Sequence, residues 1–230
     1  MTAEPQQSAH LVDWQPARAP EHRTLQGDRV RLEPLDPDRH TADLFAAAQG
    51  AGAEPDLWRY LSYGPFAEAG ELRAWLAERA ESTDPLYLAV VDLATGRAGG
   101  IVSYLRIEPA HGCIEIGHIW FGAELQRTPQ ATEAIHLLAR HAFDDLGNRR
   151  LEWKCNAANA RSRRAAERLG FTFEGVFRQH LVIKGRNRDT AWFSLLDHEW
   201  PAAHAAFDAW LSAENFDAAG RQRRPLAALR

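Results

Sequence analysis

The chain has 230 residues, of which 45% are hydrophobic and 25% are charged, and its formal net charge is −4. This size and composition are typical of a globular protein with one buried core, and the acidic balance argues against general nucleic-acid binding, which normally needs a basic excess. No apolar run approaches the length of a membrane span and no signal-peptide pattern opens the chain, so we expect a cytoplasmic protein without a membrane partner.

Composition and pattern divide the chain into three parts. Residues 1–24 are rich in Pro, Ala and Gln without periodicity, which predicts an N-terminal extension. Residues 25–200 alternate between strand-like and helix-like patterns and are expected to form the main domain. Residues 201–230 hold the rest of a C-terminal helix and a basic tail, and we expect the tail over 222–230 to be solvated rather than ordered.

The first half of the main domain is predicted to begin with a strand and two helices. Asp36 can cap the first helix, because its side chain can accept hydrogen bonds from the free N–H groups of the first turn. The elements expected before residue 108 are a strand over 28–35, helices over 36–49 and 71–81, and two hairpin strands over 86–93 and 98–107.

A long irregular segment over residues 50–70 separates these two helices. Its aromatic side chains either fill a small satellite core or contact a substrate. The candidates for substrate contact are Tyr60, Tyr63 and Phe66.

The most informative stretch runs from residue 113 to residue 173. Its first strand, over 113–121, alternates between two sets, with Ile114, Ile116, His118 and Trp120 on one face and Glu115, Ile119 and Phe121 on the other. Thr128 and Pro129 then predict a helix start, since threonine caps well and proline suits the first helical position; this helix stops at Gly147.

The elements after that helix complete the predicted order β-α-α-β-β-β-α-β-α-β-β. They are a strand over 150–155, a helix over 159–170, strands over 171–183 and 188–196, and a closing helix over 199–211. Both cysteines, Cys113 and Cys155, fall in predicted strands without ligand-type spacing, so we expect buried reduced thiols.

Two motifs carry a resemblance to a known family. Residues 126–131 are similar to a pyrophosphate loop of the form Q/R-x-x-G-x-G/A, although Pro129 replaces the first loop glycine and has no N–H to offer a phosphate. The second motif, N-x-x-S-x-x-x-x-x-x-x-G-F, is matched by Asn159, Ser162, Gly170 and Phe171. Together they resemble the GNAT acetyltransferases, most closely the branch that includes the ribosomal-protein N-terminal acetyltransferases.

This resemblance covers residues 25–200 and implies an α/β (α+β) GNAT fold. The fold has a mixed central sheet of about seven strands, splayed in the middle and flanked by helices. The resemblance further implies acetyl-CoA as acyl donor, no metal, and a primary amine on a peptide or a small molecule as acceptor. It also implies that the segment over 50–70 covers the acceptor side of the cleft. Whether the protein forms a homodimer is left open.

A helix start suits the CoA pyrophosphate, because its first N–H groups are free and the helix dipole favours negative charge. The residues predicted to hold the pyrophosphate are Gln126, Arg127, Thr128, Gln130, Ala131 and Thr132. Arg164 could reach a CoA phosphate or solvate its helix face. The resemblance implies that Asn159 bonds the pantetheine arm and that a backbone N–H near Trp120 or Phe121 polarises the thioester carbonyl.

For catalysis, the resemblance makes Ser162 the general acid that protonates the departing thiolate. A relative uses a carboxylate as general base, but the equivalent position here is the apolar Leu181. We favour Glu115 as the base, followed by His118 and then His180, and a water relay without a dedicated base stays open. On a regular strand Glu115 and His118 would face opposite sides, as would His180 and Leu181.

Two other functions compete with direct acetyl transfer to a peptide amine. Pro129 and the missing carboxylate are consistent with a non-catalytic sensor or scaffold that binds acyl-CoA. Alternatively, the same fold could acylate a small-molecule amine such as an amino sugar or a polyamine. Measured turnover would distinguish the enzyme from the non-catalytic sensor. A comparison of acceptors would distinguish a peptide amine from a small-molecule amine.

Overall fold

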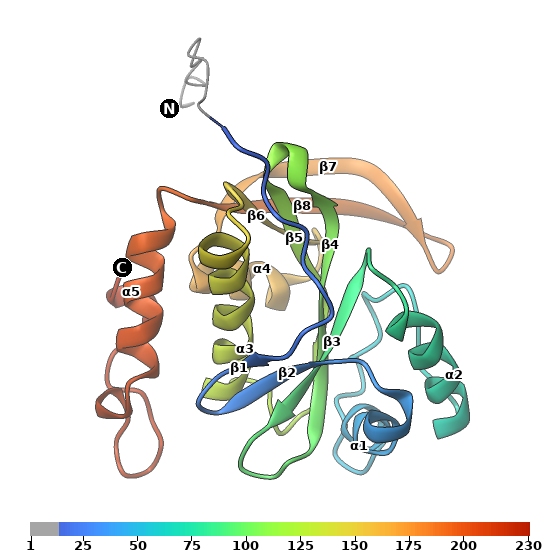
Figure 1. Cartoon of the computed structure of the whole chain (residues 1–230). Coiled ribbons are helices and arrows are strands. Elements are labelled where there is room, and N and C mark those ends of the chain that lie inside the picture. The colour runs from blue at the N-terminus through green and yellow to red at the C-terminus, as the bar shows by residue number, and fades with distance from the viewer. Residues whose placement is uncertain (1–13) are drawn as a thin grey trace.

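A mixed eight-stranded sheet in the order β1-β2-β3-β4-β5-β6-β8-β7 runs through the computed structural model, which describes residues 14–230 (Figure 1). The strands are β1 (Leu25–Gln26), β2 (Val30–Pro34), β3 (Leu86–Asp92), β4 (Ala98–Glu108), β5 (Cys113–Phe121), β6 (Arg150–Asn156), β7 (Thr172–Ile183) and β8 (Arg186–Leu196). β5 and β6 pair in parallel and the other neighbours pair antiparallel. The predicted mixed α/β sheet is confirmed, and the short β1 adds the eighth strand.

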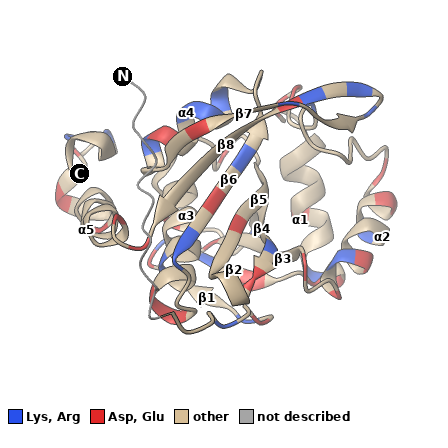
Figure 2. Cartoon of the chain, turned by 90° about the horizontal axis from the view of Figure 1, so that it is seen from above, with Lys and Arg blue, Asp and Glu red and all other residues tan. Residues whose placement is uncertain are grey.

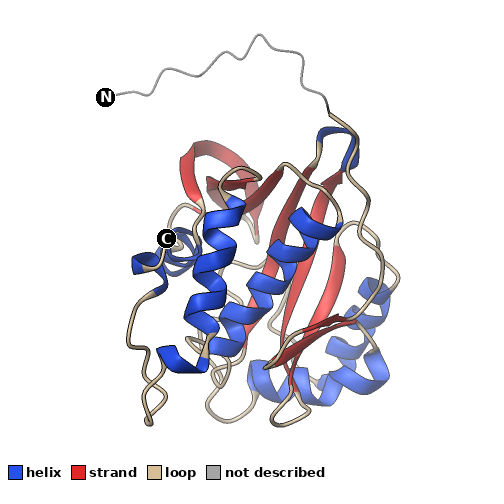
Figure 3. Cartoon of the chain, turned by 60° about the vertical axis from the view of Figure 1, so that its left-hand side comes forward, coloured by secondary structure: helices blue, strands red, loops and turns tan. Residues whose placement is uncertain are grey.

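The helices cover both faces of the sheet (Figure 3). α1 and α2 pack on one face, while α3, α4 and α5 pack on the other. Their bounds are α1 (Pro37–Gln49), α2 (Ala69–Ala80), α3 (Pro129–Arg140), α4 (Ala160–Leu169) and α5 (Trp200–Leu211). Asp36 caps α1 as predicted, accepting hydrogen bonds from the N–H groups of Asp38 and Arg39.

Each face of the sheet has its own hydrophobic core. The larger core lies under α3, α4 and α5 and includes Ile114 and Ile116 of β5. The smaller core, which we call the aromatic core, lies under α1 and α2 and includes Trp58, Tyr87 and Trp120. The sheet is therefore apolar on both sides, which explains the near-continuous hydrophobic run of β3.

A β-bulge in β5 overturns the predicted alternation of this strand. Opposite β4, Ser103 pairs with Gly117 but Ile101 pairs with Trp120, so β5 carries one extra residue here. His118 has a backbone φ of +50° at this point. Because a bulge shifts the side-chain pattern by one residue, Trp120 lies on the opposite face from Ile116, in the aromatic core.

The C-terminal tail is ordered, contrary to the expectation of a solvated segment. Leu226 is 1% exposed and belongs to the larger core. The buried Asn215 accepts from the Arg224 N–H, and Arg230 donates to the Glu167 carbonyl. The tail therefore packs along α4 and α5.

The N-terminal extension is described only from residue 14. There it runs as coil against the sheet, with the Trp14 indole donating to the Ala110 carbonyl at 3.1 Å; the remainder of the predicted extension, residues 1–13, lies outside the described residues. Cys113 is half-buried and Cys155 buried, both as free thiols. Within residues 14–230, no helix combines the length and apolar character that a membrane span requires.

Candidate active site

A cleft opens where β5 and β6 separate. The two strands pair only between residues 113–116 and residues 150–153, although both continue further. The cleft has a volume of about 1200 Å³ and is lined by both strands, the starts of α3 and α4, the segment over 54–62 and the C-terminal segment. Figure 2 shows basic residues gathered on α4 and at the tip of the β7–β8 hairpin.

At one end of the cleft lies the loop over residues 126–131, which resembles a pyrophosphate loop. Thr128 caps α3 as predicted, with its hydroxyl accepting from the Ala131 N–H at 3.3 Å, while the Thr132 N–H donates to the Thr128 carbonyl. Two of the predicted phosphate donors are thus engaged within the helix start. In the described part of the chain, the N–H groups of Arg127, Thr128 and Gln130 have no protein acceptor, so the loop keeps donors despite Pro129.

The loop is held in place by its own contacts. Gln126 donates from its side chain to the Phe121 carbonyl at 2.8 Å, which ties the loop to the end of β5. Arg127 has a φ of +62°, and Arg106 and His118, which also line the cleft, have φ values of +49° and +50°. Such left-handed conformations are costly for residues other than glycine and cluster at functional sites.

Beside the loop, arginines of the loop, of α4 and of the C-terminal segment form a basic end of the cleft. The sequence predicted Arg127 and Arg164 here, but not the contribution of the C-terminal segment. Arg168 donates to the Thr132 hydroxyl at 3.2 Å, and its guanidinium lies 4.8 Å from the ring centre of Trp210 on α5. The arginines that line this end are Arg127, Arg164, Arg168 and Arg221. The signal in the sequence was the arginine content of the segment after residue 220, but nothing in its pattern indicated that it folds back onto the domain.

The start of α4 carries the second motif into the middle of the cleft. Asn159 caps the helix by accepting from the Ser162 N–H at 3.1 Å. The Ser162 hydroxyl accepts from the indole N–H of Trp153 on β6 at 3.0 Å and lies beside the Cys155 thiol, whose pKa is raised by burial. Since the Trp153 bond occupies the acceptor side of this hydroxyl, its proton remains available to a group in the cleft.

Glu115 lies in a buried ionic cluster at the point where the strands separate. Its carboxylate is 3.0 Å from the Lys154 ammonium and 2.9 Å from the Arg106 guanidinium, and Lys154 also contacts Glu152 at 2.5 Å. Burial raises the pKa of Glu115, while Lys154 and Arg106 oppose that shift. Neither cation was predicted at the site, because a lysine in an ordinary strand pattern gives no signal of which carboxylate it will face.

His118 lines the cleft together with Glu115, which corrects the expectation of opposite faces. The bulge in β5 turns the imidazole toward Tyr63 and Tyr87, whose ring centres are 5.7 and 5.1 Å away. Burial lowers the pKa of His118 to about 4, with Arg188 among the cations that add to the shift. The imidazole is therefore neutral at neutral pH.

A similar irregularity brings His180 to the cleft. The register of β7 against β8 shifts between Phe177 and Leu181, and Gln179 has a φ of +51°. His180 and Leu181 consequently both line the cleft, not opposite faces as a regular strand would require. His180 Nδ1 lies 3.0 Å from the Thr190 hydroxyl.

The three predicted substrate residues occupy two different environments. Tyr60 lines the cleft and donates from its hydroxyl to the Ala158 carbonyl at 3.2 Å, so it reaches from the segment over 54–62 to the start of α4. Tyr63 and Phe66 instead pack with Trp58 and Trp75 in and against the aromatic core. They fill the satellite core that the sequence offered as the alternative, and Tyr63 supports the His118 ring from behind.

The mixed sheet opens between two parallel strands, and the opening lies beside two capped helix starts and a basic end of the cleft. This is the architecture of a GNAT acetyltransferase. The chain belongs to this family, because residues 29–172 match the acetyltransferase (GNAT) domain family.

Individual relatives agree with this assignment. A GCN5-related N-acetyltransferase structure from Brucella melitensis is 49% identical, with a TM-score of 0.90 over 94% of this chain and 98% of that one. YdaF of Bacillus subtilis, provisionally named a ribosomal N-acetyltransferase, is 32% identical over 47% of this chain. The ribosomal-protein-serine acetyltransferase of Escherichia coli is 34% identical over 35% of it. The chain spans 58% and 44% of those two curated relatives.

Proposed function

We propose that the protein transfers the acetyl group of acetyl-CoA directly to a primary amine. The observation that carries this proposal is the continuity of one cleft, which joins the free N–H groups of the pyrophosphate loop to Ser162 and Glu115 at the separation of β5 and β6. Bound acetyl-CoA supplies an activated acetyl group at its thioester. The chain's own residues bind it, orient it and move the protons.

Binding of the donor rests on charge and on unpaired backbone groups. The N–H groups of Arg127, Thr128 and Gln130 would hold the pyrophosphate, and Arg164 and Arg168 would pair with CoA phosphates. Beyond residue 116 the β6 side of β5 has no strand partner in residues 14–230, so its backbone can bond an extended pantetheine arm as an added strand would.

Proton transfer falls to groups in the middle of the cleft. Ser162 would protonate the departing thiolate, since its hydroxyl accepts from Trp153 and so keeps its own proton free to donate into the cleft. The incoming amine must lose a proton. Glu115 is our first candidate to accept it, directly or through water, because burial raises its pKa toward the working range. His118 is neutral and also reaches the cleft, but its pKa of about 4 makes it the weaker base.

The acceptor would enter between the segment over 54–62 and the β7–β8 hairpin. Lys184 of the hairpin donates to the carbonyls of Trp58, Tyr63 and Gly64 at 2.7–3.1 Å, which connects the two walls. Both signs of charge line this end, with Glu54 and Asp56 on one side and Arg188 on the other. This mixture suits a peptide N-terminus better than a polyamine, and the names of the ribosomal relatives point the same way.

A non-catalytic role as acyl-CoA sensor is the competing proposal. Its two grounds were the lost donor at Pro129 and the missing carboxylate on β7. The three free N–H groups of the loop and the presence of Glu115 in the cleft weaken both grounds. Turnover distinguishes the two functions.

The test is a thiol-release assay with acetyl-CoA and a panel of peptides, amino acids, amino sugars and polyamines, with product masses measured in parallel. We expect acetylated peptide or small amine, and a changed acceptor preference for Tyr60→Ala. Tyr63→Ala is the matched control, since it should lower stability rather than change preference. Binding of acetyl-CoA without release of thiol for any acceptor would favour the sensor, and polyamines as the best acceptors would refute our account of the acceptor side.

A further inference from the structure

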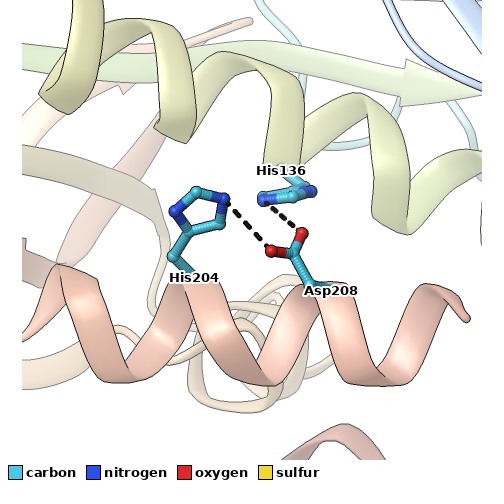
Figure 4. Close-up of side chains that lie close together, drawn as sticks. All are labelled: His136, His204 and Asp208. Carbon is cyan, nitrogen blue, oxygen red and sulfur yellow. Dashed lines mark ion pairs between the residues drawn. The ribbon is translucent and has the colours of Figure 1, made fainter.

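Three side chains of metal-binding type meet between α3 and α5, on the larger-core side of the sheet. His136 comes from α3, and His204 and Asp208 come from α5, one helical turn apart on the same face (Figure 4). One ligand atom from each residue lies within 4.8 Å of the others. None of the three belongs to the lining of the acyl-CoA cleft.

The geometry leaves polar groups without hydrogen bonds. His136 is 4% exposed, and its Nε2 has no hydrogen-bond partner among residues 14–230. That nitrogen points at Asp208, whose Oδ1 is 3.7 Å away, while Oδ2 of the same carboxylate is 3.4 Å from His204 Nε2 (Figure 4). A buried polar nitrogen that is aimed at a carboxylate without bonding it indicates a missing partner.

Both imidazoles are held by aromatic stacking. The His136 ring stacks on Phe207 at 4.9 Å with an 11° angle between planes, and the His204 ring stacks on Trp200 at 4.8 Å and 12°. Behind His204, an oxygen of Asp144 lies 3.8 Å from Nδ1, and the other oxygen accepts from the Trp200 indole at 2.7 Å. At 3.8 Å this carboxylate is beyond hydrogen-bond distance of Nδ1, but it lies on the side from which a carboxylate orients a histidine ligand at metal sites.

We propose that His136, His204 and Asp208 bind a divalent transition-metal ion, with Zn²⁺ as the best fit, and that the ion fastens α5 to α3. Two imidazoles and one carboxylate are a ligand set that zinc accepts, with a water molecule as fourth ligand. Ligand atoms about 2.0–2.1 Å from a tetrahedral ion lie about 3.3 Å apart. The observed 3.4 and 3.7 Å involve different oxygens of Asp208, and the three ligand atoms lie within 4.8 Å of one another. Rotation of the half-buried His204 and the exposed Asp208 side chains would bring them to this spacing.

This site runs against the sequence-based expectation of no metal. His136 precedes His204 by more than sixty positions, and the histidine and aspartate of α5 look like an ordinary exposed ion pair at i and i+4. Only the packing of α3 on α5 brings the buried nitrogen to them. A bound ion would hold α5 in place, and with it Trp210, which borders the basic end of the cleft.

The sample is the untagged full chain with Cys113→Ser, which removes its more accessible thiol. Zn²⁺ binding is measured by calorimetric titration with ZnCl₂, and Co²⁺ binding by absorption spectroscopy during titration with CoCl₂. We expect one ion per chain, a four-coordinate Co²⁺ spectrum, and a melting temperature that rises with Zn²⁺ but not with Mg²⁺. Because loss of even an outer partner weakens metal binding about 10- to 100-fold, His204→Ala and Asp208→Asn should weaken Zn²⁺ binding by at least that factor.

His198→Ala is the matched control, since His198 is exposed, pairs with Asp197 and lies outside the cluster. It should bind Zn²⁺ like the parent protein. Both test variants change partly exposed side chains, so their folding can be verified by circular dichroism before titration. Equal Zn²⁺ affinity in parent, His204→Ala and Asp208→Asn would overturn the proposal, as would the absence of saturable binding; either result would leave the cluster as an ionic contact between two helices.

Discussion

Replacement of Ser162 by alanine should separate the chemistry of the cleft from its binding function. The Ser162 hydroxyl accepts from the Trp153 indole at 3.0 Å, and Trp153 is 5% exposed, so the variant deprives a buried donor of its acceptor. A lost hydrogen bond of this kind costs about 1–3 kcal/mol, and we expect the lower end because the cleft can admit water. For a chain of this size, about 1 kcal/mol corresponds to about 2–4 °C in melting temperature.

The kinetic effect should be much larger than this structural one. General acid catalysis contributes about 100-fold or more to rate, which corresponds to about 2.7 kcal/mol in the activation barrier. We therefore expect kcat to fall at least about 100-fold while the dissociation constant for acetyl-CoA changes little. The assays are thiol release under saturating acetyl-CoA, calorimetric binding and thermal unfolding.

Trp153→Phe is the control, because it removes the same hydrogen bond and keeps the hydroxyl. It should lower stability by a similar amount and leave kcat within a few-fold of the parent value. If Ser162→Ala loses no more activity than Trp153→Phe with an acceptor whose chemistry is rate-limiting, the role of Ser162 as general acid is wrong, and the residue only starts a helix.

Three further predictions concern stability and donor binding. Burial lowers the pKa of His118 from 6.5 to about 4, so the unfolded state binds a proton more readily than the folded state. The free energy of unfolding should therefore fall by up to about 3 kcal/mol as the pH drops from about 6.5 to about 4. In urea unfolding curves His118→Gln should reduce this loss, and the same dependence of stability on pH in the variant would contradict the prediction. Glu133 accepts three backbone N–H bonds at the start of β2, so Glu133→Gln should lower the free energy of unfolding by at least about 3 kcal/mol. Glu124 is exposed, and an equal loss of stability in Glu124→Gln would refute a specific role for Glu133. Arg164→Ala should weaken acetyl-CoA binding about tenfold by calorimetry, and Arg73→Ala on α2 should not; equal effects would exclude a direct phosphate contact.

The local signals in the sequence predicted the elements that depend on neighbouring residues. Asp36, Thr128 and Asn159 cap their helices through side-chain hydrogen bonds, because capping requires only a suitable side chain two or three residues before a free N–H. Gly170 ends α4 with a φ of +102°, the left-handed conformation that glycine adopts most readily. The mixed sheet was anticipated from the family resemblance that two of these motifs support.

The errors arise where distant segments decide the outcome. The bulge at His118 depends on how β5 aligns with β4, and a period-two pattern cannot reveal one inserted residue. The alternative left open for Tyr63 and Phe66 also depended on a distant segment, because α2 supplies the Trp75 that packs against them in the core. The role of Glu133 could not be seen in its own helix, because its carboxylate binds the backbone at the start of β2, about a hundred residues earlier in the chain.

The most direct test of the central claim is a crystal structure of the protein with CoA bound. This assignment of the site predicts the pyrophosphate within hydrogen-bond distance of the Arg127, Thr128 and Gln130 N–H groups. It also predicts the pantetheine between β5 and β6, with the sulfur beside the Ser162 hydroxyl. CoA bound outside this cleft, or with its sulfur remote from Ser162, would contradict both the assigned site and the proposed acetyl transfer.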